Sequence, residues 1–477
     1  MATGAQPVRS LWLQEALSDG AAPCPPLRGE QRADVCIVGG GYVGLWTALR
    51  LRELEPALDI AVLERDVCGG GASGRNGGFV LSWWAKLLSL RKVCGAEEAT
   101  RLARSSAEAV LDVGRFCQAH GVDAHYLLDG WLWAATSEAQ LGAWRETQEA
   151  AAKSGDHPFE ELGGDEVAAR AGSSVHVGGV LERTAASVQP ALLARGLRRV
   201  ALERGIRIFE GSPMLDLERG RPPHVRTPEG RLAADRVVLA LNAWAARFAE
   251  IRQAIVVVSS DMIATPPLPD RLAELGWSDG LTISDGRTLV NYYRTTRDGR
   301  IAFGKGGMTG RLPFGGHVGA TVEGASRMVP ALEEWLQRTY PALGPLRADA
   351  SWTGPIDRTQ SGIPLFWRLG GREDLVYGVG FSGNGVGPSV LAGRVLASLA
   401  LGLRDEWSES ALVRRPQRDF PPEPIRYLGG QLVRAAVAAK DRAEDAGRTP
   451  GLATRWLASL APAGLSPFKG QKAGLGD

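Results

Sequence analysis

The stretch Asp34–Glu64 is the most informative part of this 477-residue chain, and it reads DVCIVGGGYVGLWTALRLRELEPALDIAVLE. Its first five residues are mostly apolar and β-branched, which is typical of a strand buried on both faces. Three consecutive glycines follow, and then a helical run that continues to Glu55. A second short apolar segment, Ile60–Leu63, ends at Glu64. This order predicts a strand, a glycine turn, a helix and a second strand.

The glycines of this stretch have the spacing G-x-G-x-x-G. In a dinucleotide-binding turn the first glycine permits the tight turn, the second leaves room for a pyrophosphate, and the third lets the helix pack close to the strand. The free N–H groups at the start of the helix, and its positive dipole end, then face the phosphates. The predicted cofactor contacts in this turn are Gly39, Gly41, Tyr42, Val43 and Gly44.

Glu64 lies 20 residues after Gly44, which is where such units place an acid that accepts hydrogen bonds from a ribose 2′-OH. Arg65 follows it and is a further candidate contact. A residue that recognises a 2′-phosphate usually replaces the acid instead of following it. The unit therefore predicts an ADP group without a 2′-phosphate, as in FAD or NAD, and the spacing leaves both open.

Composition describes an ordinary globular protein. The length predicts roughly two or three domains of ~150 residues, and the chain is 44% hydrophobic and 23% charged with a net charge of +2, which gives no reason to expect nucleic-acid binding. It contains no apolar run of the ~18 residues that a membrane-spanning helix needs. Five scattered cysteines, with no C-x-x-C pair, argue against a zinc site or a disulfide framework. We expect a cytoplasmic protein with reduced thiols, no metal and no transmembrane segment.

A second glycine-rich segment, Cys68–Phe79, follows the acid and reads CGGGASGRNGGF. So much glycine beside Ser, Arg and Asn predicts a loop whose backbone closely approaches a planar or charged ligand. Its candidate contacts are Ala72, Ser73, Arg75, Asn76, Gly77 and Gly78.

The sequence GASGRNGG at Gly71–Gly78, behind the G-x-G-x-x-G unit, resembles the FAD-dependent amine oxidoreductases of the D-amino acid oxidase-like superfamily, and in particular their γ-glutamylputrescine oxidase-like branch. The resemblance implies FAD as the cofactor. It also implies an α/β fold, in which a Rossmann-like FAD-binding domain of the glutathione-reductase type is interleaved with an α+β substrate domain built on a mostly antiparallel sheet. The expected FAD-binding segments are 31–94, 182–247 and 350–405, the expected substrate or cap segments are 95–181 and 248–349, and 406–477 is a C-terminal helical extension.

Another strand, glycine loop and helix occur at Leu375–Leu403. The resemblance implies that this second helix start stabilises the reduced flavin, through Gly383, Asn384, Gly385 and Val386. It also implies that Met214, Asn242 and Ala243 lie beside the FAD. Two glycine-rich helix starts so far apart in the sequence suit one long cofactor that runs between them. Asp357 and Arg358 precede this loop, and the sequence leaves open whether they form a structural pair or line the pocket.

Asp298-Gly299 lies between two strand-like segments, 289–294 and 300–305, and predicts a hairpin. Asp129-Gly130 predicts a second one, within 126–133. Side chains alternate across a strand, so Tyr292 and Arg294 share one face. Tyr293 and Arg294 are candidates to bind a substrate acid group. Sarcosine-oxidase-like relatives place a lysine over the flavin to speed its reaction with oxygen, and Lys305 is the candidate here.

The resemblance implies oxidation of a C–N bond, with hydride passing to the flavin from a carbon that bears a neutral amine. The expected partners are a small-molecule amine, for example a polyamine derivative or an aminophosphonate, and oxygen or another electron acceptor. The alternatives are an amino-acid oxidase or dehydrogenase in which Arg294 or Arg358 holds a carboxylate, an NAD-linked dehydrogenase, and a non-catalytic flavin-binding protein. A predicted amphipathic helix, 425–446, covers the FAD domain, forms a homodimer or contacts a membrane surface.

Overall fold

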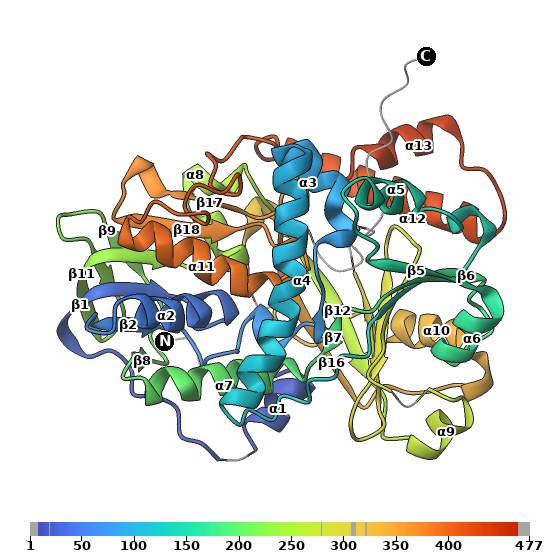
Figure 1. The fold of residues 1–477 in the computed structure, drawn as a ribbon, viewed down its shortest axis with the longest axis horizontal. Coiled ribbons are helices and arrows are strands. Elements are labelled where there is room, and N and C mark those ends of the chain that lie inside the picture. Colours follow the sequence, from blue (N-terminus) through green and yellow to red (C-terminus); the bar gives the residue numbers. More distant parts are fainter. Residues whose placement is uncertain (1–7, 19, 278, 307–311, 320–321, 466–477) are drawn as a thin grey trace.

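The computed structural model describes residues 8–18, 20–277, 279–306, 312–319 and 322–465. Two eight-stranded sheets lie on either side of the long helix α4 (Ala96–Ala119), as Figure 1 shows. The first sheet has the strand order β17 (Leu365–Arg368), β18 (Leu375–Val379), β11 (Gly230–Leu239), β1 (Gly29–Val38), β2 (Ile60–Leu63) and β8 (Arg207–Phe209), with β9 (Asp216–Glu218) and β10 (His224–Arg226) attached to β11.

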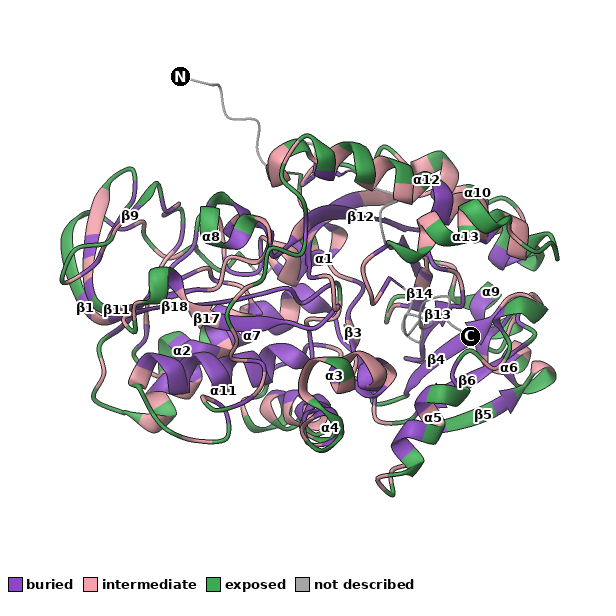
Figure 2. Cartoon of the chain, turned by 90° about the horizontal axis from the view of Figure 1, so that it is seen from above, coloured by how far each residue is buried: buried purple, intermediate pink, exposed green. Residues whose placement is uncertain are grey.

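The centre of the first sheet is parallel, with β1 paired to β2 on one side and to β11 on the other. Helices α2 (Tyr42–Leu54), α7 (Pro190–Glu203) and α11 (Pro388–Leu401) pack on one face of it (Figures 1 and 2). Val35 and Ile37 of β1 join this helical core, whereas Cys36 and Val38 join the core on the opposite face. The strand is therefore apolar throughout because both of its faces are buried.

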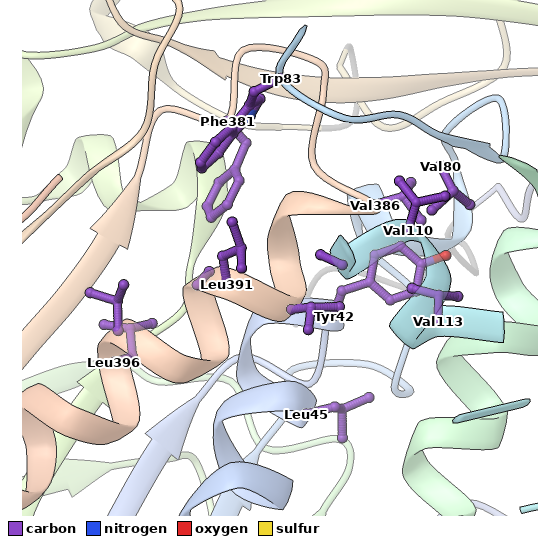
Figure 3. Close-up of a cluster of buried hydrophobic side chains, with 14 of the residues drawn as sticks. Tyr42, Leu45, Val80, Trp83, Val110, Val113, Phe381, Val386, Leu391 and Leu396 are labelled. Carbon is purple, nitrogen blue, oxygen red and sulfur yellow. The ribbon is translucent and has the colours of Figure 1, made fainter. Parts of the chain in front are cut away.

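The helix-covered core also joins the two glycine-rich segments. Figure 3 shows Tyr42 and Leu45 of α2 in one cluster with Leu391 and Leu396 of α11. Phe381 belongs to the same cluster and comes from the loop that precedes α11. Packing of α2 against α11 thus fixes the position of one glycine turn relative to the other.

The second sheet has the order β16 (Ala350–Arg358), β12 (Val256–Ala264), β15 (Ile301–Lys305), β14 (Asn291–Thr295), β13 (Thr282–Asp285), β4 (Trp131–Ala135), β6 (Gly178–Glu182) and β5 (Phe159–Gly163). All of its pairings are antiparallel except that between β4 and β13. The predicted α/β class with a mostly antiparallel second sheet is confirmed. A two-stranded ribbon, β3 (Phe79–Val80) with β7 (Ala186–Ser187), lies outside both sheets.

Two details of the prediction differ from the structure. The expected FAD-binding segment 350–405 begins with β16, which pairs along nine residues with β12 of the second sheet. The hairpin predicted at Asp129-Gly130 is also wrong, because β4 pairs with β6 and β13 instead of with residues 126–128. The hairpin at Asp298-Gly299 is confirmed as β14–β15.

The remaining helices pack around the two sheets and on one another. They are α1 (Leu11–Ala16), α3 (Leu87–Cys94), α5 (Arg145–Ala152), α6 (Gly164–Ala171), α8 (Ala249–Arg252), α9 (Pro269–Glu274), α10 (Val329–Thr339), α12 (Ile425–Asp445) and α13 (Leu452–Ser459). The predicted C-terminal helix is α12, and its Val437 packs with Val258 and Leu289 of the second-sheet region. None of the helices within the described ranges combines the length and apolar character that crossing a membrane requires.

Candidate active site

A cavity of about 660 Å³ lies between the two sheets, and both glycine-rich helix starts border it. Gly41 lines one part and Gly383 another. Its size falls within the range typical of cofactor and small-molecule sites. The two turns that the sequence predicted to hold one extended molecule therefore open onto the same space.

The β1–α2 turn has the geometry that its glycines predict. Gly39 has φ of +117°, a conformation that side-chain-bearing residues rarely adopt. A Cβ on Gly44 would overlap the carbonyl oxygen of Gly39, so only glycine lets the helix approach the strand this closely. The amide of Tyr42 donates to Ser73 Oγ at 2.9 Å. This bond ties the turn to the second glycine-rich loop.

Glu64 lies at the end of β2, on the cavity wall. Its Oε2 accepts from the amide of Gly40 at 2.8 Å, and its Oε1 accepts from the amide of Asp66 at 3.0 Å. Burial raises the pKa of this carboxyl, and the two amide bonds oppose that shift. The carboxyl group is thus held in place at the position predicted for the ribose.

The loop 71–78 borders the cavity, and its polar side chains bond to backbone groups of the protein. The Arg75 guanidinium donates to the carbonyls of Gly70 at 3.0 Å, Thr353 at 3.1 Å and Val8 at 2.7 Å. The Asn76 amide donates to Ser73 O at 2.9 Å and its Oδ1 accepts from the Gly78 amide. These side chains hold the shape of the loop, since they bond to the protein itself.

Most of the predicted cofactor contacts line the cavity. They are Gly39, Gly41, Tyr42, Val43, Glu64, Arg65, Ala72, Ser73, Arg75, Asn76, Gly77, Met214, Asn242, Gly383, Asn384, Gly385 and Val386. Gly44, Gly78 and Ala243 lie behind this wall, where Gly44 packs on Gly39 and the Ala243 amide donates to Asn242 Oδ1 at 2.7 Å.

Asp357 joins the loops at the far end of the cavity. Its carboxylate accepts from the Gly380 amide at 2.6 Å and from Asn242 Nδ2 at 3.2 Å. Burial raises the pKa of Asp357 to about 7. Asn242 and Ser382 have positive φ values of 48° and 57°, and such strain in residues other than glycine is concentrated at functional sites.

Lys305 and Tyr293, both predicted to be catalytic, face away from this cavity. Lys305 pairs with Asn291 and Gly304 pairs with Tyr292 across β14 and β15. Since paired residues share a face and Tyr292 lines the cavity, Lys305 and Tyr293 belong to the opposite face. The Tyr293 hydroxyl bonds to His176 Nε2 at 2.6 Å within an aromatic core.

The ammonium group of Lys305 donates to Leu289 O and Asn291 Oδ1, both at 2.9 Å, beside a separate cavity. Arg294 is on the expected face, but its guanidinium is covered. It donates to the carbonyls of Gly77 at 2.8 Å and Val188 at 2.6 Å. The positions of Lys305, Tyr293 and Arg294 therefore do not support contact with a flavin or a substrate.

The cavity wall contains other polar residues that no motif singled out. Tyr292 bonds through its hydroxyl to Ser260 Oγ at 2.9 Å. Lys86 donates to Gly362 O at 2.8 Å, and burial lowers its pKa to about 7. Glu182 also lines the cavity, and so does Arg358, which the sequence analysis named as a candidate to hold a carboxylate. The only sequence signal for Glu182 and Lys86 is a charged residue within an otherwise apolar segment.

Within the described ranges, no group of three or more His, Cys, Asp or Glu side chains is arranged to hold a metal ion.

The family model described as "FAD dependent oxidoreductase" (DAO) matches residues 34–399. The chain belongs to this family. Among curated proteins, the flavoenzyme is 30% identical to γ-glutamylputrescine oxidoreductase of Escherichia coli K12 over 88% of this chain and 93% of that protein. It is 25% identical to glycine oxidase of Bacillus licheniformis over 81% of this chain and 98% of that protein.

Among solved structures, glycine oxidase from Geobacillus kaustophilus matches with a TM-score of 0.66 at 21% identity, over 80% of this chain and 98% of that chain. This match shows the fold. The flavoenzyme is an FAD-dependent oxidoreductase, and its own cavity fits that cofactor. The turn at Gly39–Gly44 leaves no room for a Cβ at Gly44, Glu64 supplies an acceptor, and the second loop lies along the same cavity.

Proposed function

We propose that this flavoenzyme oxidises the C–N bond of a small primary or secondary amine, such as a polyamine derivative or an aminophosphonate, and that oxygen is the electron acceptor. The observation that carries the proposal is the single cavity that joins Gly41, Gly383 and the second-sheet residues Trp131 and Tyr292. It gives one space for a dinucleotide and, beside it, a wall suited to a small organic substrate. Similarity to γ-glutamylputrescine oxidoreductase along nearly the full length supports an amine.

FAD, when bound, supplies the two-electron acceptor for this reaction. We propose that the residues around Gly39–Val43 and Glu64 hold its ADP part and that Gly383–Val386 hold its opposite end. The second sheet then closes the substrate side. Trp131 donates from Nε1 to Ser284 Oγ at 3.0 Å, and Tyr292 bonds to Ser260. Both rings are thereby fixed, so they exclude water from the reacting carbon.

An anaerobic reduction screen tests the proposal. Purified holoenzyme is mixed without oxygen with putrescine, γ-glutamylputrescine, 2-aminoethylphosphonate, glycine or D-alanine, and the flavin absorbance is followed. We expect bleaching by at least one of putrescine, γ-glutamylputrescine and 2-aminoethylphosphonate, and recovery of the absorbance with hydrogen peroxide formation when air is admitted. A flavin that glycine or D-alanine alone bleaches contradicts the amine assignment.

Oxidation of an amino acid is a second candidate, and Arg358 favours it. This arginine is buried, lines the cavity and donates to Gly464 O at 3.0 Å, while its Nε has no hydrogen-bond partner among the described residues. A guanidinium with a free donor suits a carboxylate. If amino acids are the substrates, Arg358→Met removes their turnover. If simple amines are, the same variant still reduces its flavin with putrescine.

A further inference from the structure

Glu182 is the last residue of β6 and borders the cavity with its neighbour Trp131 of β4. The residue is fully buried, with 0% of its surface exposed. The other residues of this strand, Gly178–Leu181, are glycine or apolar, so their side chains cannot form a hydrogen bond with the carboxyl. A carboxyl group at such a position needs a compensating interaction, because burial of an unpaired polar group is costly.

Among the described residues, only one oxygen of Glu182 has such an interaction. The Ser82 hydroxyl donates a hydrogen bond to Oε1. Oε2 is buried and has no hydrogen-bond partner among the described residues. Burial raises the pKa of Glu182 to about 8, and the Ser82 hydrogen bond opposes this shift. The carboxyl thus has one unpartnered oxygen, and its residue borders a cavity that is lined for a ligand.

Ser82 also connects this carboxyl to the glycine-rich loop that contains Asn384. The carbonyl oxygen of Ser82 accepts from Asn384 Nδ2 at 3.1 Å. Asn384 belongs to the loop that we propose to hold one end of the FAD. Hydrogen bonds therefore link the Glu182 carboxyl, through Ser82, to Asn384, which lies in the part of the cavity where we expect the reaction. Trp131 adds an aromatic side chain to the same wall, and such rings favour cations.

We propose that Glu182 is the residue that binds the amino group of the substrate and takes its proton. The assignment rests on the proposed function, in which the substrate is an amine. In the proton transfer, R–NH₃⁺ and the Glu182 carboxylate become R–NH₂ and the Glu182 carboxylic acid. The N–H bond breaks, the O–H bond forms and no electron is transferred. The product is the neutral amine that donation of hydride from the adjacent carbon requires.

Other ionisable groups border the same cavity from the surrounding elements. They are Lys86 before α3, Tyr292 of β14, Asp357 and Arg358 of β16, Glu64 and Arg65 after β2, Tyr42 of α2, Arg75 of the second glycine-rich loop, Arg247, Arg252 and His317. None of them contributes to the pKa shift of Glu182, whose causes are burial and Ser82 alone. Lys86 and Asp357 each have a pKa of about 7. Glu182→Gln retains both groups, so its comparison with the wild type isolates the part of the pH dependence that belongs to Glu182.

The proposal predicts a definite pH profile for flavin reduction at low concentrations of the best amine in the screen. In the wild type, the productive pair is R–NH₃⁺ with a carboxylate. The rate constant should rise up to the pKa of Glu182, about 8, and fall again above that of the amine, roughly 10.4. Glu182→Gln cannot take the proton and reacts only with R–NH₂. Its profile should rise up to ~10.4 and should not fall. At pH 8 its rate should be at least about fivefold lower, because it lacks the ion pair that binds R–NH₃⁺ and Glu182 is half ionised at that pH.

A pair of compounds that cannot be oxidised gives a readout independent of turnover. tert-Butylamine has no hydrogen on the carbon that bears nitrogen, and tert-butanol is its neutral counterpart. Titration of each at pH 8.5 is followed by the change in flavin absorbance. We expect the ammonium to bind the wild type more tightly than the alcohol does. Glu182→Gln should weaken the ammonium at least tenfold and change the alcohol less than twofold.

Glu160→Gln is the matched control, because it removes the same charge from an exposed residue of the adjacent strand β5, where Glu160 pairs with Arg183. It should retain the wild-type profile. Ser82→Ala gives a second test that leaves the carboxyl in place. Loss of its hydrogen bond raises the pKa of Glu182 further, so the ascending limb should move to higher pH.

The possible failures are distinguishable. If no amine reduces the wild-type flavin, the proposed function is refuted together with this assignment. If amines reduce the wild type and Glu182→Gln with the same pH profile, only the role of Glu182 is refuted. Equal binding of tert-butylamine and tert-butanol to the wild type also refutes it. A Ser82→Ala profile that matches the wild type contradicts the proposed titration.

Discussion

Replacement of Gly44 by alanine tests how tightly the fold and the cofactor site are connected. A Cβ at this position would overlap the carbonyl oxygen of Gly39 and would lie 3.1 Å from its carbonyl carbon and 3.3 Å from Ile37 Cγ2. The obstacle is backbone, so α2 must move away from β1. Such overpacking costs about 1–3 kcal/mol. If this cost falls on the cofactor-bound state, FAD should bind between about fivefold and about 150-fold more weakly.

The assay is FAD binding to the apoprotein by quenching of flavin fluorescence, together with thermal unfolding in the presence and absence of FAD. Gly163→Ala is the matched control, because Gly163 has φ of −71° and a Cβ there would meet nothing within 4 Å. We expect the control to bind FAD as the wild type does. If Gly44→Ala matches the control in FAD affinity and in unfolding temperature, close packing of α2 on β1 does not shape the site.

Three further substitutions give separate tests. Glu64→Ala leaves the amides of Gly40 and Asp66 without their acceptor, and loss of hydrogen bonds to a charged group, about 1.5–3 kcal/mol each, should weaken FAD binding at least tenfold in the same fluorescence titration. Lys86→Met removes a buried ammonium whose pKa is lowered to about 7. In the wild type, this lowered pKa destabilises the folded state increasingly as the pH falls from ~10.4 to about 7. Urea unfolding should therefore show a larger stability gain of the variant over the wild type at pH 6.5 than at pH 9.5, and an equal difference at both pH values contradicts this. Lys305→Met should lower stability by about 1–3 kcal/mol through its lost bonds to Leu289 and Asn291 but leave the rate of flavin reoxidation by oxygen unchanged in stopped-flow measurements, and a slower reoxidation would restore Lys305 as a residue that acts on the flavin.

The nucleotide end of the site was predictable because its physics is local. Within about thirty residues, the sequence contains the buried strand, the turn glycines, the helix and the acid, and each restricts its neighbours. Gly39 needs its positive φ and Gly44 needs its missing Cβ whatever the rest of the chain does. The structure places Glu64 on the cavity wall for the same reason, since β2 must lie beside β1.

The substrate end was less predictable, because there the chemistry depends on which face of a strand meets the cavity. The Asp298-Gly299 turn fixed the pairing of β14 with β15, but a shift of one residue reverses every side chain. Lys305 and Gly304 differ by that one residue, and it is Gly304 that pairs with the cavity-lining Tyr292. Glu182 comes from another strand, β6, and only the assembled sheet brings it beside Trp131.

The buried arginines show why residue type alone could not identify the substrate wall. Arg75 donates to four carbonyl groups and Arg294 to three, in each case from more than one segment of the chain. Their charges are therefore dispersed over the backbone, and they fix loops in place. Arg358 donates to one carbonyl and retains a buried donor, Nε, without a partner among the described residues. An arginine that holds the fold uses its N–H donors on the protein, whereas one that faces a ligand keeps a donor unused. Tertiary contacts alone determine which donors of an arginine are used.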